Sequence, residues 1–275
     1  MNLNAWDWIV ISTSGGKDSQ AMMAMMVRMA REQGVLDKVV AVHADLGRVE
    51  WAGTAALAHR HAMRHGIQFR KVRRDEDLLD HIERRGKFPS PTARYCTSDH
   101  KRDQIAKVYT QLARETRDAW GSDWRQVRIL SCMGFRAQES PARAKRKVLQ
   151  VNKRQSNGKR EVTDWLPIHD WLETRVWEEI RTSGTDHHPA YDWGMPRLSC
   201  CFCIFAPRSA LMIAGQRNPE LLAEYVRVEK ASGHQFRGEP GKTGSYETGP
   251  LALTEIKEAL DRGDTFGPVG EWGNQ

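Results

Sequence analysis

The residues best suited to chemistry lie near the N-terminus, in the segment STSGGKDS at residues 12–19. Its two adjacent glycines let the backbone approach a ligand closely, and its hydroxyl groups can donate hydrogen bonds to phosphate oxygens. Lys17 adds a charge-assisted donor. A β-branched run precedes the segment and a helix expected at 18–33 follows it, so free helix N–H groups would point at the same place. The segment therefore predicts a phosphate-binding turn without the Walker A spacing. A tight strand–helix connection is the alternative.

A second group of reactive side chains is SCCFC at residues 199–203. Cys200 and Cys203 have the C-x-x-C spacing that thiolate ligands of zinc or of an iron–sulfur cluster use. The chain has five cysteines, and we expect it to be cytoplasmic, so a disulfide framework is not expected.

Basic charge is concentrated between Arg143 and Arg160. The whole chain has 42 Lys and Arg against 35 Asp and Glu, a formal net charge of +7. The basic residues of this segment, with no acidic residue among them, are Arg143, Lys145, Arg146, Lys147, Lys153, Arg154, Lys159 and Arg160. Clustered basic side chains neutralise phosphates and release counterions, which favours a nucleic acid or nucleotide partner. A solvated hairpin is the alternative.

The elements that must position these residues alternate between strands and helices. Strands are expected at 8–12, 39–43, 67–72 and 127–133, and helices at 18–33, 50–65 and 97–117. This alternation predicts βαβ units in an α/β fold with a doubly wound, mostly parallel sheet. Ligands of such sheets bind beyond the carboxyl ends of the strands, where the phosphate-binding turn would lie.

The pattern changes after about residue 161, where helices are expected at 165–180, at 207–232 with a break at Asn218–Pro219, and at 253–260. We therefore expect a nucleotide-binding α/β domain at 1–165, a helical region with most of the cysteines at 166–232, and a Gly/Pro-rich tail with one helix at 233–275. No apolar run approaches the roughly 20 residues that cross a membrane. The N-terminus has no basic region typical of a signal peptide, so a cytoplasmic location without membrane contact is expected.

SGGKDS at residues 14–19 resembles the signature of PP-loop ATP pyrophosphatases, of the adenine nucleotide α-hydrolase-like superfamily. Those enzymes split ATP between the α and β phosphates and adenylate a substrate. The resemblance implies ATP with Mg²⁺ as cofactor and catalytic roles for Lys17 and Asp18. The implied phosphate-binding residues are Ser12, Ser14, Gly15, Gly16, Lys17, Asp18 and Ser19.

Further segments resemble the phosphoadenylyl-sulfate (PAPS) reductase-like branch of that superfamily. They are VHADLG at 42–47, RYCTSDHKR at 94–102, GFRAQES at 134–140, and residues 165–203. The resemblance implies that His43 and Asp45 lie near adenine and ribose. It implies that Gly134 and Arg136 bind the nucleotide, with Arg136 acting on the α phosphate, where charge develops as pyrophosphate leaves. A structural ion pair between Arg136 and Glu139 is the alternative.

Two departures separate the chain from sulfonucleotide reductases. The resemblance implies that those enzymes attack sulfate with a cysteine in a C-terminal tail motif, whereas no cysteine follows Cys203 here. Such reductases also tend to lose the intact SGGKDS, which is complete in this chain. Thiol-dependent reduction of PAPS or its unphosphorylated analogue APS is therefore the second hypothesis.

Cys96 lies in a segment similar to one that bears iron–sulfur ligands in related enzymes. A [4Fe–4S] cluster on Cys96, Cys200 and Cys203, with one iron open or bound by Cys201, would hold sulfide for an adenylated substrate. Cys201 is accordingly the catalytic cysteine candidate. Zinc is the alternative metal, with its fourth ligand among Cys201, Cys132, His187 and His188.

Two other roles for the thiols stay open. One thiol could carry a persulfide, which would need a pKa lowered by Arg94, Lys101 or Arg197. The thiols could instead be small buried hydrophobic side chains.

The branch resemblance favours DNA as the substrate, because the sulfur-transfer ATPases of DNA phosphorothioation systems are PAPS reductase-like. The compact chain resembles the smaller protein of the single-stranded (Ssp-type) system more than its longer double-stranded (Dnd-type) counterpart. The resemblance implies that a DNA backbone phosphate is adenylated for sulfur insertion. A cysteine desulfurase and other modification-system proteins are the implied partners. A nucleotide-sensing module that binds nucleic acid through residues 143–160 is a third hypothesis.

Overall fold

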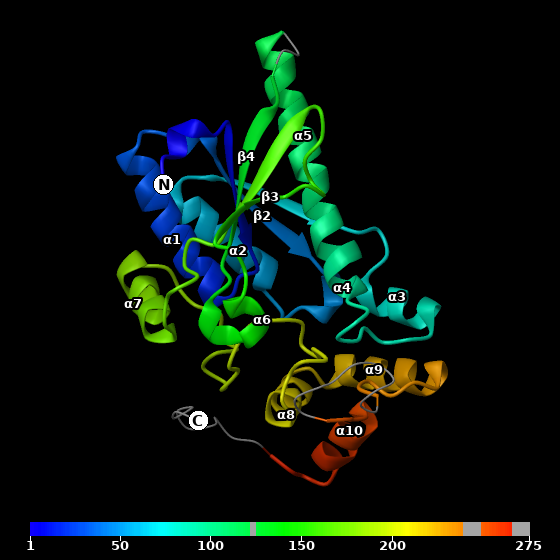
Figure 1. Ribbon diagram of the computed structural model, residues 1–275. Helices are drawn as coiled ribbons and strands as arrows, with labels where there is room; N and C mark the ends of the chain where they lie inside the picture. The colour runs from blue at the N-terminus through cyan, green and yellow to red at the C-terminus, as the bar shows by residue number, and fades with distance from the viewer. Residues whose placement is uncertain (122–124, 239–248, 266–275) are drawn as a thin grey trace. The chain divides into compact units, whose positions relative to one another are not determined.

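The computed structural model describes residues 1–121, 125–238 and 249–265 (Figure 1). Its contacts divide the chain into two units. The first, here called the sheet unit, comprises Met1–Ala44, Gly53–Val72 and Asp103–His188. The second, called the helical unit, comprises Asp45–Ala52, Arg73–Arg102 and the chain from Pro189 onward. The units are thus interleaved along the sequence, whereas we expected the consecutive regions 1–165, 166–232 and 233–275. Within the expected tail, 239–248 and 266–275 lie outside the described residues.

A six-stranded sheet with the order β3-β2-β1-β4-β6-β5 dominates the sheet unit. The strands are β1 (Trp8–Thr13), β2 (Val39–Asp45), β3 (Gln68–Arg73), β4 (Val127–Met133), β5 (Leu149–Val151) and β6 (Arg160–Trp165). β1 pairs in parallel with β2 and β4, and β4 pairs in parallel with β6. β5 is antiparallel to β6. The expected α/β fold with a mostly parallel sheet is confirmed.

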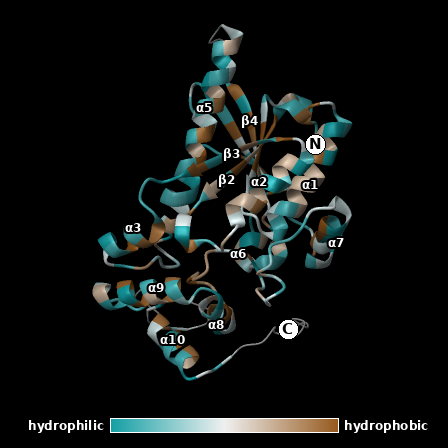
Figure 2. Ribbon diagram, turned by 180° about the vertical axis from the view of Figure 1, so that it is seen from behind, coloured by the Kyte–Doolittle hydropathy of each residue, from teal (hydrophilic) through white to brown (hydrophobic). Residues whose placement is uncertain are grey.

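Helices cover both faces of this sheet. Apolar side chains of β1, β2 and β4 pack on one face against α1 (Lys17–Glu32), α2 (Thr54–His65) and α7 (Glu173–Ser183). Side chains from the alternate positions of the same strands pack on the other face against α5 (Asp103–Trp120). Because both faces are buried, the central strands are mostly hydrophobic (Figure 2). This explains why they appear in the sequence as largely apolar runs.

The helical unit has a hydrophobic core of its own. It contains α3 (Leu78–Arg85), α4 (Tyr95–Thr97), the π-helical turn Ser98–Arg102, α8 (Arg208–Arg217), α9 (Pro219–Ser232) and α10 (Leu253–Asp261). α9 packs against α3, α8 and α10. The break between α8 and α9 falls at Asn218, as expected, because Pro219 has no N–H for a continuing helix.

The remaining elements are short. They are α6 (Pro141–Ala144) and 3₁₀ turns at Leu3–Ala5, Leu36–Lys38, Gly47–Val49 and Ala137–Glu139. The helix expected at 165–180 begins only at Glu173, and the one expected at 97–117 begins as α4 and the π-helical turn. The sequence pattern did not predict α3, β5 or β6. In the described part of the chain, no helix is both long and apolar enough to cross a membrane.

Candidate functional site

The expected phosphate-binding segment forms the turn between β1 and α1. Gly15 has a positive φ of 70°, and Gly16 is the N-cap of α1. The Ser19 hydroxyl accepts a hydrogen bond from the Ser14 N–H (3.1 Å) and donates one to the Gly16 carbonyl (2.9 Å). The turn is therefore held by its own side chain at the N-terminus of α1, where free N–H groups and the helix dipole favour an anion.

A second loop reaches the same place from β4. β4 is the parallel neighbour of β1, with Met133 paired to Ser12, so the two loops leave the sheet side by side. A Cβ atom at Gly134 would lie 2.9 Å from the Asp18 carbonyl oxygen and 3.0 Å from its carbonyl carbon. The two backbones therefore touch, and only glycine leaves room for this approach.

The Arg136 guanidinium is buried next to α1. Its Nε donates to Asp18 Oδ1 (2.6 Å), and its Nη1 donates to Gln138 Oε1 (2.6 Å) and to the Trp171 carbonyl (3.4 Å). The Glu139 carboxylate instead accepts from the backbone N–H of Arg136 (3.0 Å). The ion pair of the Arg136 side chain is thus with Asp18, across the two loops, rather than with Glu139.

Glu173, the first residue of α7, completes this group of charges. Its Oε1 lies 3.5 Å from Lys17 Nζ, and its Oε2 lies 3.8 Å from Arg136 Nη2. Sequence reasoning missed this residue. An acidic side chain in the first turn of a helix is a general preference, so nothing in the pattern distinguished Glu173 from a capping residue.

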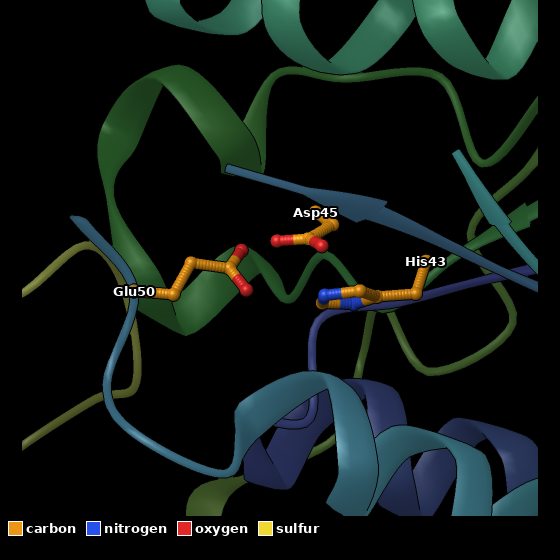
Figure 3. A group of neighbouring side chains, drawn as sticks. All are labelled: His43, Asp45 and Glu50. Carbon is orange, nitrogen blue, oxygen red and sulfur yellow. The ribbon is translucent and has the colours of Figure 1, made fainter. Parts of the chain in front are cut away.

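The carboxyl end of β2 carries the other expected nucleotide-binding residues. His43 is buried, and its Nδ1 lies 3.0 Å from the Thr13 carbonyl oxygen of β1. Asp45, the last residue of β2, accepts a hydrogen bond from the Gly47 N–H (2.8 Å). Figure 3 shows the Asp45 carboxylate facing that of Glu50, with oxygen atoms within 4.8 Å of each other. Two carboxylates at this spacing fit a hard divalent cation such as Mg²⁺. Glu50 was not anticipated.

The three expected metal ligands all belong to the helical unit. Cys96 lies on α4, and Cys200 and Cys203 precede α8; all three are half-buried. Burial raises the pKa of the Cys96 and Cys200 thiols, and the neighbouring Cys203 raises both further. The nearby Lys101 opposes this rise without reversing it. The lowered pKa that a persulfide carrier would need is therefore absent at Cys96 and Cys200.

Cys201 does not occupy the position expected for a catalytic nucleophile. Its side chain is fully buried in the core of the helical unit, and its N–H donates to the Val49 carbonyl (2.9 Å). Burial raises the pKa of this thiol to about 12, which disfavours the thiolate that a nucleophile requires. Cys132 is equally buried, in β4 of the sheet unit. Cys201 is thus placed as a core residue, and our expectation of catalysis by it is not supported.

The sequence of the chain matches a known family. The family model described as "Phosphoadenosine phosphosulfate reductase domain" matches residues 8–206. The chain belongs to this family. The resemblance to the PAPS reductase-like branch is thereby confirmed. This chain is 30% identical over 153 residues to a protein of Escherichia phage 186, described as "Uncharacterized 37.8 kDa protein in gpa 5'region". The match covers 56% of this chain and 42% of the phage protein, less than half of that relative's length.

Solved structures with a similar chain path include three enzymes. Candida glabrata FMN adenylyltransferase, in complex with FMN and an ATP analogue, has a TM-score of 0.45 at 13% identity, covering 72% of this chain and 56% of that one. PAPS reductase from Candida auris has a TM-score of 0.38 at 15% identity, covering 70% and 80%. The U34-tRNA thiolase NcsA from Methanococcus maripaludis, with its [4Fe–4S] cluster, has a TM-score of 0.38 at 12% identity, covering 92% and 80%. Similarities of this size concern the fold alone.

The close approach at Gly134 can be tested by Gly134→Ala. The added Cβ would push the Asp18 backbone out of place, since a carbonyl group cannot yield as a side chain can. We expect a loss of about 1–3 kcal/mol in the free energy of unfolding. ATP affinity should fall on the order of tenfold or more, because the same backbone forms the phosphate-binding turn.

Gly158→Ala in the same unit is the matched control, because nothing lies within 4 Å of its added Cβ. Chemical denaturation and calorimetric titration with ATP measure the two effects. Wild-type ATP affinity in Gly134→Ala would contradict the role given to this contact.

Proposed function

We propose that the chain is an ATP pyrophosphatase, which cleaves ATP between the α and β phosphates and transfers AMP to an acceptor. The observation that carries this proposal is the intact SGGKDS turn with two buried cations beside it. The side chains of Lys17 and Arg136 are each only 3% exposed, and both lie next to the N-terminus of α1. Positive groups preorganised in a site with little water stabilise charge that develops on phosphate oxygens.

In the reaction, an acceptor oxygen attacks the α phosphorus and forms a new P–O bond. The bond between the α phosphorus and the bridging oxygen breaks, and pyrophosphate leaves with the electron pair. Lys17 and the turn N–H groups would bind the β and γ phosphates, and Arg136 would bind the α phosphate. Mg²⁺ bound with ATP would neutralise further charge on the phosphates. Asp18 holds the Arg136 guanidinium in place (2.6 Å).

We further propose that the acceptor is a nucleic acid, and specifically a backbone phosphate of DNA. The support comes from the β5–β6 hairpin and the segment before it. Val148, Leu149 and Val151 are 44%, 47% and 51% exposed, and Lys145, Lys147 and Lys153 beside them are exposed as well. Within the described residues, no carboxylate forms an ion pair with these three lysines, whereas Arg143 pairs with Glu139 and Arg154 pairs with Asp103. The unpaired lysines are available to phosphates.

The hairpin is also connected to the nucleotide-binding loop. Glu139, which accepts from the Arg136 N–H, forms an ion pair with Arg143. The Arg143 and Arg146 guanidinium groups both lie over the Phe135 ring, at 4.5 and 5.1 Å from its centroid. A nucleic acid bound along the lysines would therefore lie on a surface continuous with the loop that carries Arg136.

The last part of the proposal is that sulfur is inserted after adenylation. Cys96, Cys200 and Cys203 suit an iron–sulfur cluster. These three thiols are partly buried and raise one another's pKa, so their thiolate forms would be stable only beside positive charge, which bound iron would supply. A bound [4Fe–4S] cluster would supply a place for sulfide. Attack of sulfide on the activated phosphorus would form a P–S bond and break the P–O bond to AMP, which would leave with the electron pair. A cysteine desulfurase would supply the sulfur as a persulfide, which a thiol reductant would convert to sulfide, together with other modification-system proteins. Zinc on the same thiols is the alternative.

Reduction of PAPS is a second candidate function, which the family match over residues 8–206 favours. The two functions differ in their products. Sulfite released from PAPS in the presence of a thiol reductant would support reduction, whereas AMP and pyrophosphate released from ATP support the first proposal.

Lys17→Ala tests the ATP chemistry. We expect the wild-type protein to form AMP and pyrophosphate from ATP with Mg²⁺ and an acceptor. Loss of the buried cation should lower that rate about 100-fold or more, since one preorganised donor contributes on this order. Coupled assays for pyrophosphate and for orthophosphate distinguish cleavage between the α and β phosphates from cleavage between the β and γ phosphates. Lys257→Ala, an exposed lysine that pairs only with Asp261 among described residues, is the control. Orthophosphate without pyrophosphate from the wild-type protein would refute the proposal.

The double substitution Lys145→Gln/Lys147→Gln tests nucleic acid binding by the hairpin. Removal of two phosphate contacts should weaken binding of single-stranded DNA similarly for all sequences. It should also reduce the slope of log K against log salt by about 1.5. Fluorescence anisotropy over a range of salt concentrations measures both. Lys230→Gln/Lys257→Gln changes the same charge in the helical unit and should leave both unchanged. An unaltered slope in the hairpin variant would exclude this surface.

Anaerobic purification followed by absorption spectroscopy and metal analysis tests the thiol ligands. We expect the visible absorption of an iron–sulfur cluster in the wild-type protein and its loss in Cys96→Ser. Cys132→Ala, which alters a core thiol of the sheet unit, should keep the cluster. Far-UV circular dichroism checks that each variant is folded. A wild-type protein with neither iron nor zinc would refute the ligand assignment, and zinc alone would refute the cluster.

A further inference from the structure

An exposed aromatic side chain lies next to the cysteine loop of the helical unit. Phe205 is 38% exposed, and within the described part of this unit no other large hydrophobic side chain is exposed. A single exposed apolar side chain is common on protein surfaces and needs no explanation by itself. The surroundings of Phe205 therefore decide whether the ring has a function.

The backbone holds Phe205 in this outward position. The Ala206 N–H donates to the Cys203 carbonyl (2.9 Å), which closes a turn around Ile204 and Phe205. The Ala206 carbonyl in turn accepts from Nη1 of the fully buried Arg237 (3.1 Å). Ile204 and Ala206 are only 5% and 8% exposed, so both neighbours of Phe205 are fixed in the core. An anchored turn thus presents the ring to solvent.

A guanidinium group is stacked on the same ring. The Arg94 Cζ atom lies over the Phe205 ring, 5.0 Å from its centroid. Arg94 is exposed and forms no ion pair with any acidic residue that the structure describes. A guanidinium that stacks on a ring keeps the N–H donors in its own plane available for a phosphate. The pair therefore combines an aromatic surface with a cation that has no acidic partner.

This pair lies beside two of the proposed metal ligands. Phe205 follows Cys203 by two residues, and Arg94 precedes Cys96 by two. Arg94 is also the N-cap of α4, which carries Cys96. Burial raises the pKa of the Cys96 thiol, Cys203 raises it further, and the Arg94 charge opposes the rise. The two segments that bring these thiols together therefore also bring the ring and the guanidinium together.

We propose that Phe205 and Arg94 form a platform on which one unpaired base of the acceptor nucleic acid stacks. The proposal rests on the proposed function, because it takes the acceptor to be a nucleic acid. An aromatic ring has two faces, so it can hold a guanidinium on one and a base on the other. Every base has such a face, so binding here would tolerate any sequence. Arg94 would bind the adjoining phosphate, and the strand would then be held beside Cys96 and Cys203.

A base inside a duplex is already stacked on its neighbours, and taking it out costs free energy. The platform therefore selects a single strand, or a nucleotide that is unpaired. This is a separate requirement from the phosphate contacts of the hairpin lysines, which a duplex satisfies equally well.

Phe205→Leu tests the stacking, because it keeps an apolar side chain and removes the ring. The probes are oligothymidylate and an abasic strand with the same number of phosphates, both followed by fluorescence anisotropy. We expect the dissociation constant of oligothymidylate to rise about tenfold, as for the loss of one stacked base, and that of the abasic strand to stay unchanged. Phe205→Trp should bind oligothymidylate at least as tightly as the wild-type protein. Phe69→Leu, the same substitution in β3 of the sheet unit, is the control and should alter neither value.

Arg94→Lys is the second variant, since it keeps the charge and removes the planar group. We expect about threefold weaker binding of oligothymidylate, with the salt dependence retained because the charge is unchanged. Far-UV circular dichroism checks that each variant is folded.

The other outcomes are distinguishable. If Phe205→Leu weakens both strands equally, the ring only supports the fold and the platform is refuted. Unchanged binding of oligothymidylate by Phe205→Leu also refutes it, while the proposed function stands. If the wild-type protein binds neither strand, the platform and the nucleic acid acceptor fail together. Formation of AMP and pyrophosphate from ATP is measured without these strands and tests the ATP chemistry independently.

Discussion

The site depends on the contact between two loops that leave adjacent parallel strands. Gly134, after β4, lies against the Asp18 backbone at the start of α1, at a distance that no larger residue allows. This approach lets the Arg136 side chain reach Asp18 (2.6 Å) and bury its guanidinium beside the phosphate-binding turn. The register of β1 with β4 and the packing of α1 on the sheet are therefore requirements of the site as well as of the fold.

Burial gives these charges their chemical value and their cost. A buried cation interacts strongly with a phosphate because little water screens it, and for the same reason it is unstable without a partner. The sheet unit meets this requirement with Asp18, which lies 2.6 Å from Arg136, and with Glu173, which contacts both cations from a half-exposed position. Asp18 orients the Arg136 guanidinium through a close hydrogen bond, whereas Glu173 lies farther from both cations, at 3.5 and 3.8 Å.

Local patterns predicted β1 to β4, the turn between β1 and α1 and most helices, because buried parallel strands and helix breaks depend on neighbouring residues in the chain. Glu173 could not be found in this way. Its partners Lys17 and Arg136 lie 156 and 37 residues earlier in the chain, and they contact it only in the folded sheet unit. The sequence could not show that Cys201 is buried. Its neighbours Cys200 and Cys203 are half-buried, and Cys201 differs from them only because its side chain lies inside the core of the helical unit. β6 was missed because Arg160, Glu161 and Asp164 interrupt its apolar pattern.

The interleaving of the two units explains where the motifs occur along the chain. The chain leaves the sheet unit as β2 ends, at Asp45, and again as β3 ends, at Arg73. The segment VHADLG lies where the chain first leaves the sheet unit, at the end of β2, and RYCTSDHKR lies where the chain returns to it, just before α5. In open α/β sheets the carboxyl ends of strands are where ligands bind and where loops can lengthen without disturbing the core. The turn, Gly134 and Arg136 all belong to the sheet unit, whereas Cys96, Cys200 and Cys203 belong to the helical unit. The crossings at the strand ends therefore separate the two groups of reactive side chains, which explains why they alternate along the sequence.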